Sequence, residues 1–112
     1  MAVLDPVAAD ELGVQLEQQG ERVVVGAWGE LDISSANEFE VKLRQAIRGS
    51  AFGVILDLGD VTFMDSIGMH VLISAAGLAH GIGRELVVLR GSEHVRQVIE
   101  TSGVDDLLPL AD

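Results

Sequence analysis

The sequence contains no cysteine, so it has no disulfide framework, no thiolate metal site and no cysteine nucleophile. Aromatic residues make up only 4% of the 112 residues, whereas hydrophobic residues make up 48%. The core must therefore be built from aliphatic side chains. A chain of this length forms one domain with a single two-layer core and is too short for two. The lack of cysteine fits a reducing compartment, and we expect a cytoplasmic protein.

Positive charge is also scarce, since seven Lys and Arg residues stand against 18 Asp and Glu residues, a formal net charge of −11. Binding to nucleic acid or to an anionic membrane depends on clustered Lys and Arg. Long hydrophobic runs are missing too, because the most apolar stretch, residues 71–79, is half as long as a membrane span of roughly 20 residues. The composition therefore argues against nucleic acid as a partner and against membrane insertion.

The first ten residues carry no positive charge and no long apolar run, unlike a signal peptide. They contain small residues and a proline, with little to bury. We expect residues 1–10 to be a flexible N-terminal lead-in and residues 11–112 to form the folded domain.

Apolar periodicity predicts alternating strands and helices. Residues 12–17 and 22–28 flank a turn-like sequence and are expected to form a β-hairpin. Further strands are predicted at 52–58, 86–89 and 107–110, and the nearly continuous apolar run of 52–58 suggests burial on both faces. Helices are expected between these strands. The order β-β-α-β-α-β-α-β predicts an α/β fold with a mixed four- to five-stranded sheet flanked by helices.

Serines mark the three predicted helix starts. Ser35 and Glu38 have the spacing of a capping box, and Ser92 precedes the last helix. Ser66 begins the middle helix, which is expected to run to about His80. The apolar residues of this helix spread around most of its circumference instead of forming one stripe. Either the helix is buried on several sides, or it presents an exposed apolar surface to a partner.

Ser66 is also the clearest candidate for chemistry. It follows an apolar strand and stands close to three carboxylates, Asp57, Asp60 and Asp65. Free N–H groups and the helix dipole favour a negative group at a helix start. From these residues alone, Ser66 is a helix cap, a phosphate acceptor or both.

Two short motifs give a more specific signal. Residues 61–68 have the pattern Val-x-Phe-x-Asp-Ser-x-Gly, and residues 29–32 read Gly-Glu-Leu-Asp. The first resembles the signature of STAS-domain anti-sigma factor antagonists, and the second resembles that family's other recurring tetrapeptide. The resemblance extends over residues 11–110. The sequence departs from the pattern at Ile67, where many members carry a second Ser or Thr, and at Met69-His70, where Leu-Gly is common.

The resemblance implies a STAS domain over residues 11–112 that is not an enzyme and uses no cofactor. It implies that an anti-sigma factor, itself an ATP-dependent serine kinase, binds the unphosphorylated protein and so releases a sigma factor. That kinase would phosphorylate Ser66 and end the interaction, and a PP2C-type phosphatase would reverse the modification. The expected partner-binding residues surround the acceptor: Asp32, Asp65, Ser66, Ile67, Gly68, Met69 and His70.

Other functions are possible on the same sequence. A STAS module can serve as a scaffolding or transport-complex subunit without phosphorylation, and a small nucleotide-binding protein is a third option. Asp32 and Asp65 resemble a general acid/base pair, but no nucleophile elbow, Gly-rich phosphate loop or catalytic triad accompanies them. His80 and His94 have no metal-ligand spacing, so no metal site is expected.

Overall fold

The computed structural model describes residues 12–89, 91–101 and 110–111. The predicted lead-in, residues 1–10, and residues 107–109 of the last predicted strand lie outside the described residues. The elements follow the predicted order: β1 (Leu12–Gln19), β2 (Arg22–Leu31), α1 (Ala36–Gly49), β3 (Gly53–Met64), α2 (Ser66–Gly81), β4 (Glu85–Leu89), α3 (Glu93–Thr101) and β5 (Leu110–Ala111).

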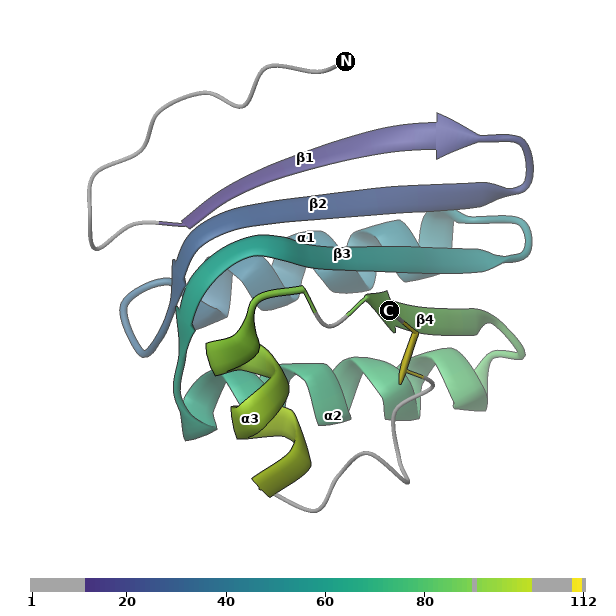
Figure 1. Cartoon of the computed structure of the whole chain (residues 1–112). Helices are drawn as coiled ribbons and strands as arrows, with labels where there is room; N and C mark the ends of the chain where they lie inside the picture. The colour runs from purple at the N-terminus through teal and green to yellow at the C-terminus, as the bar shows by residue number, and fades with distance from the viewer. Residues whose placement is uncertain (1–11, 90, 102–109, 112) are drawn as a thin grey trace.

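The strands form one sheet in the order β1-β2-β3-β4-β5 (Figure 1). β1 and β2 are antiparallel and confirm the predicted hairpin, while β2 to β5 are parallel neighbours. A helix joins each parallel strand to the next, so the carboxyl ends of these strands lie at one end of the sheet. Loops at such an end commonly carry binding sites in α/β proteins.

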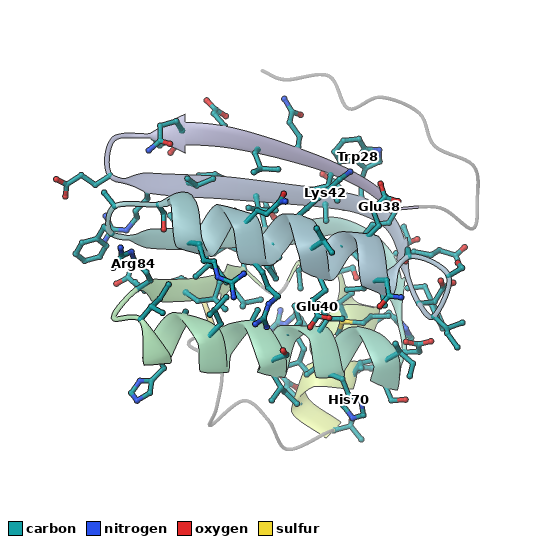
Figure 2. All side chains as sticks on the ribbon, turned by 180° about the vertical axis from the view of Figure 1, so that it is seen from behind. Trp28, Glu38, Glu40, Lys42, His70 and Arg84 are labelled. Atoms are coloured by element: carbon teal, nitrogen blue, oxygen red, sulfur yellow. The ribbon has the colours of Figure 1, made fainter. Side chains whose placement is uncertain are left out.

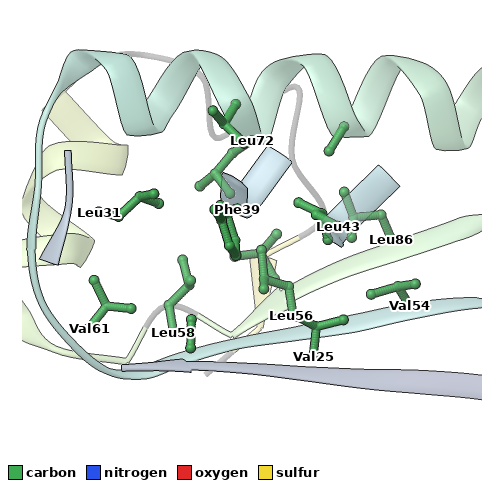
Figure 3. Close-up of a cluster of buried hydrophobic side chains, with 14 of the residues drawn as sticks. Val25, Leu31, Phe39, Leu43, Val54, Leu56, Leu58, Val61, Leu72 and Leu86 are labelled. Carbon is green, nitrogen blue, oxygen red and sulfur yellow. The ribbon is translucent and has the colours of Figure 1, made fainter. Parts of the chain in front are cut away.

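The hydrophobic core lies between the sheet and the helices. α1 and α2 lie side by side over one face of the sheet (Figure 2). Phe39 and Leu43 of α1 and Leu72 of α2 meet Val25 and Leu56 of the sheet in a tightly buried cluster (Figure 3). Full burial of such a side chain stabilises the fold by about 1.5–3 kcal/mol. The aliphatic core predicted from the composition is therefore present.

The expectation that β3 is buried on both faces was wrong. Val54 and Leu56 are buried, whereas Ile55 and Asp57, which point to the opposite face, are half-buried. The reason is that α1 and α2 both pack on the first face, so a continuous apolar run does not by itself require cover on both sides.

β3 is also longer than predicted, since it continues to Met64 instead of ending at residue 58. The exposed pair Gly59 and Asp60 interrupts the apolar run, which is why the sequence favoured a loop there. The strand passes through this point with shifts in its register against β2. Val61 and Met64 are buried beyond the irregularity, so the end of β3 is fixed to the core.

Within the described ranges, no helix is both long enough and apolar enough to cross a bilayer.

Candidate functional site

The candidate site lies where β2 and β3 end together. Leu31 and Met64, the last residues of the two strands, are partners in the sheet. Immediately after them, the Asp65 N–H donates a hydrogen bond to the Leu31 carbonyl at 3.3 Å. This bond holds the start of α2 beside the loop that leads into α1. The two sequence motifs, 29–32 and 61–68, therefore meet at one edge of the molecule.

The cap of α2 is Asp65, so of the two roles left open for Ser66 the cap is excluded, while Ser66 does begin the helix as expected. The Asp65 carboxylate accepts a hydrogen bond from the Gly68 N–H at 3.0 Å. Ser66 is the first residue inside the helix and is exposed. An ionised carboxylate at the cap also interacts favourably with the helix dipole, so it takes the place that a serine would fill. Among the described residues, no hydrogen bond is found to the Ser66 hydroxyl.

Two of the expected partner-binding residues, Gly68 and Met69, are buried, so the expectation of surface contact at these positions is corrected. A side chain at Gly68 would place its Cβ 2.7 Å from Met64 Cγ and 3.0 Å from the Leu31 carbonyl oxygen. Met69 is 3% exposed and belongs to the core cluster. Gly68 is therefore required for close packing of α2 on the end of β2. Ile67 and His70, by contrast, are exposed.

Asp32 begins a hydrogen-bonded loop at the start of α1. Its Oδ1 accepts hydrogen bonds from the Ser34 hydroxyl at 2.7 Å and from the Ser34 N–H at 3.0 Å. The bond from the Ser34 hydroxyl is the largest cause that lowers the pKa of Asp32, and it outweighs the opposing effect of partial desolvation. The Asp32 N–H donates to the Ser35 hydroxyl at 3.1 Å. The carboxylate is thus ionised and fixed in place.

The predicted capping box of α1 is not formed. The Ser35 hydroxyl donates instead to the Glu30 carbonyl at 2.9 Å, and it makes no cap hydrogen bond. Glu38 pairs with Lys42 at 3.2 Å, as its i,i+4 spacing predicts. The spacing of a capping box is therefore present, but Ser35 forms its hydrogen bond within the loop and Glu38 forms an ion pair on the outer face of the helix.

Ile67 was among the expected partner-binding residues, but the sequence did not point to two further apolar side chains exposed at this end, Ile33 and Phe63. Ile33 is 78% exposed, Phe63 is 39% exposed and Ile67 is 38% exposed. Large apolar side chains exposed together around polar groups are typical of protein interaction sites. Ile33 could have been noticed from the sequence, because an isoleucine between Asp32 and two serines belongs to neither a strand nor a helix pattern. We call Ile33, Phe63 and Ile67 the apolar patch.

Sequence analysis also missed the contribution of α3, which lies at the same end of the sheet (Figure 1). The ring of His94 stacks on the ring of Phe63, with centroids 5.3 Å apart and planes inclined by 16°. A groove of about 360 Å³ is lined by Ser66 of α2 and by four residues of α3, His94, Gln97, Val98 and Thr101. No sequence signal links α3 to Ser66, because only the tertiary fold brings them together.

Two contacts hold α3 at this position. The Ser92 hydroxyl donates to the Val61 carbonyl at 2.9 Å and accepts from the Val95 N–H at 3.3 Å, which confirms the predicted cap. Gly91, with φ +68°, packs so closely on the backbone of Gly59 that a Cβ would lie 2.4 Å from the Gly59 Cα. The α3 side of the groove is therefore anchored directly to β3.

Comparison with known proteins identifies the family. Residues 14–109 match the family model described as "Mlab, STAS domain". The chain belongs to the STAS domain family. This STAS domain is 27% identical over 104 residues to the anti-sigma F factor antagonist of Paenibacillus polymyxa, which covers 90% of the chain and 89% of that protein.

Solved structures agree with this assignment. An anti-sigma factor antagonist from Mycobacterium paratuberculosis has a TM-score of 0.84 and 25% identity, with 92% of this chain and 87% of that chain covered. The anti-sigma factor antagonist SpoIIAA in its unphosphorylated form has a TM-score of 0.73 and 27% identity, with 89% of each chain covered. Bacillus SpoIIAA in its phosphorylated form has a TM-score of 0.67 and 26% identity, with 89% and 92% covered. The STAS fold expected from the two motifs is confirmed.

Proposed function

We propose that this STAS domain is an anti-sigma factor antagonist whose activity is ended by phosphorylation of Ser66. The observation that carries the proposal is the exposed Ser66 hydroxyl, one residue past the Asp65 cap. At the corresponding start of α1, the hydroxyls of Ser34 and Ser35 are engaged in the loop. The names of its relatives support the role, and SpoIIAA has been solved in both unphosphorylated and phosphorylated forms.

The unphosphorylated domain binds an anti-sigma factor that is also an ATP-dependent serine kinase. The apolar patch of Ile33, Phe63 and Ile67 supplies surface that gains free energy when it is covered. The carboxylates of Asp32 and Asp65 lie at the same end and make this surface negatively charged. A charged surface favours partners of complementary charge and orients them as they approach. His70 lies one turn along α2 and completes the exposed surface. Gly68 and Met69 support this surface from beneath.

Phosphorylation changes the charge of this surface without changing the fold. A phosphoserine adds a charge of about −1.5 to −2 next to the Asp65 carboxylate. Because Ser66 is exposed and at a helix start, the phosphate needs no rearrangement of the core. In a docked complex, however, an unpaired buried charge costs several kcal/mol, and the partner dissociates. A PP2C-type phosphatase restores the binding form.

The domain itself supplies no catalytic group to this cycle. The kinase brings the base and the nucleotide, and Ser66 brings only the hydroxyl that is phosphorylated. Both partners and the sigma factor are cytoplasmic, and so is the proposed place of action.

The proposal is tested by incubating the purified protein with ATP and a candidate anti-sigma kinase and measuring the intact mass. We expect one phosphate on the parent protein and none on Ser66→Ala. Ser34→Ala is the matched control, because it removes an exposed serine from the loop before α1, and this variant should still accept the phosphate. The switch would be refuted if Ser66→Ala were still phosphorylated. It would also be refuted if the parent protein received no phosphate from any kinase that binds it.

A second candidate is a structural subunit that is never phosphorylated. The observation that favours it is that the matching family model is described as "Mlab, STAS domain", a name different from those of the anti-sigma factor antagonists among the relatives. The two candidates differ in one readout, the binding of a partner by Ser66→Glu. The phosphorylation switch predicts that this substitution weakens capture of the anti-sigma kinase, whereas a scaffolding subunit would be recovered in its assembly without any dependence on ATP.

A further inference from the structure

A phosphate on Ser66 would lie beside a groove between α2 and α3, and two residues of α3 that line this groove carry hydrogen-bond donors. Ser66 lines one wall, and His94 and Gln97 line the other wall from α3. His94 and Gln97 are both exposed, and no hydrogen bond to either side chain is found among the described residues. The volume of about 360 Å³ is large enough for a phosphate group, and because the lining is mainly apolar, the phosphate depends on the polar ends of His94 and Gln97.

The imidazole of His94 is held in place for such a contact. Its face is occupied by the stack on Phe63, whose position is fixed by the end of β3. A stacked ring keeps its edge free, and the edge carries both ring nitrogens. Stacking thus reduces the rotamer freedom that His94 would lose on binding, which lowers the cost of forming a hydrogen bond.

The charges around the groove show why a donor is needed. Asp65 adjoins Ser66 and Glu93 adjoins His94 in the sequence, and both carboxylates oppose a dianion. Arg96 of α3 lines a neighbouring groove with Glu93 instead. Within the described residues, His94 in the groove and His70 one turn along α2 offer ring N–H donors close to Ser66.

We propose that the phosphate on Ser66 is held in this groove by the His94 imidazolium and the Gln97 side-chain amide. The inference rests on the proposed phosphorylation of Ser66. It adds that phosphorylation joins the start of α2 to α3 and fills a groove that is open in the unphosphorylated protein. The modified surface therefore differs in shape as well as in charge. His94 is a positioning residue for the phosphate and takes no part in its transfer.

The test places phosphoserine at position 66 during translation, through a reassigned stop codon, so that no kinase is needed. The second pKa of the phosphate, about 6 in a free phosphoserine, is measured by ³¹P NMR titration of the full chain. A bound imidazolium stabilises the dianion, so we expect His94→Gln to raise this pKa by roughly half a unit. Phe63→Leu, which removes the ring under His94, should raise it by a smaller amount.

His80→Gln is the matched control. His80 lies in the last turn of α2, roughly 20 Å along the helix from Ser66 at 1.5 Å per residue, and its loss should leave the phosphate pKa unchanged. Equal pKa values in the parent and His94→Gln, with the fold intact by circular dichroism, would overturn the proposal. Because the phosphate is installed without a kinase, a failure of the proposed partner switch leaves this result standing, and the reverse also holds.

Discussion

α1 and α2 leave the carboxyl ends of neighbouring strands and lie side by side on one face of the sheet, yet they present different surfaces (Figure 2). α1 has one buried stripe and an outer face with the ion pair of Glu38 and Lys42. α2 contains no Asp, Glu, Lys or Arg. It packs on α1, on β3 and β4, and on α3, so it is buried over a wide arc. The two alternatives raised by its sequence are thus both partly right, because only its first turn exposes a large apolar residue, Ile67.

The starts of α1 and α2 also differ in how their serine hydroxyls are hydrogen-bonded. Each begins with an aspartate and a nearby serine, but in α1 the serine hydroxyls are bonded within the loop. In α2 the aspartate caps the helix, and Ser66 is displaced into the first turn. Where the aspartate takes the cap, as in α2, the serine hydroxyl is therefore left without an intramolecular hydrogen bond among the described residues.

The largest effect is expected from two neighbouring residues of α2, of which Met69 is buried and His70 is exposed. Met69→Asp places an unpaired charge in the core and should lower the free energy of unfolding by about 4 kcal/mol or more. His70→Asp lies on the exposed side and should change it by no more than about 0.5 kcal/mol. Urea denaturation measures both. Equal losses in the two variants would show that the assignment of buried and exposed sides is wrong.

A second pair of variants compares Gly68 and Gly77, two of the three glycines of α2. Gly68→Ala meets Met64 and the Leu31 carbonyl and should cost about 1–2 kcal/mol of stability. Gly77→Ala has no atom within 4 Å of the new Cβ and should gain about 0.5–1 kcal/mol from helix propensity. The same denaturation curves give both values. A stabilised Gly68→Ala would contradict the close approach of α2 to β2.

The third prediction concerns the cap. Asp65→Ala removes the acceptor for the Gly68 N–H and should cost about 1 kcal/mol, whereas Ser66→Ala should be neutral within about 0.5 kcal/mol. Thermal unfolding at neutral pH compares them. If Ser66→Ala were the more damaging of the two, the cap would have been assigned to the wrong residue.

The smallest effect is expected at the start of α1. Because the folded protein lowers the pKa of Asp32, the carboxylate contributes stability at pH values above 3.8, and this contribution is lost as the pH falls through the lower folded pKa. Ser34→Ala removes the hydroxyl that lowers the pKa most and should return it toward 3.8. Carboxyl ¹³C NMR titration follows the change. Ser50→Ala, at the far end of α1, should leave the Asp32 pKa unaltered.

Periodicity and motif spacing were sufficient to predict the order of elements, the hairpin and the position of α2, because these depend on local alternation and on residues close in sequence. They were insufficient where the structure of a segment depends on contacts with residues distant in the sequence. β3 continues past Gly59 and Asp60 because the end of β2 pairs with residues 61–64 of β3. Asp65, not Ser66, is the cap because the Leu31 carbonyl fixes its backbone. His94 reaches the site only through the anchoring of α3 to β3.

The attachment of α3 to β3 through Gly91 and Ser92 divides the site between two stretches of chain. The serine and its cap are encoded in 61–68, and the opposite wall of the groove is encoded in 94–101. Substitutions in the second stretch can alter one wall of the groove while leaving Ser66 and its cap untouched. Duplicated copies of such a domain could therefore diverge at that wall and still keep the same helix start.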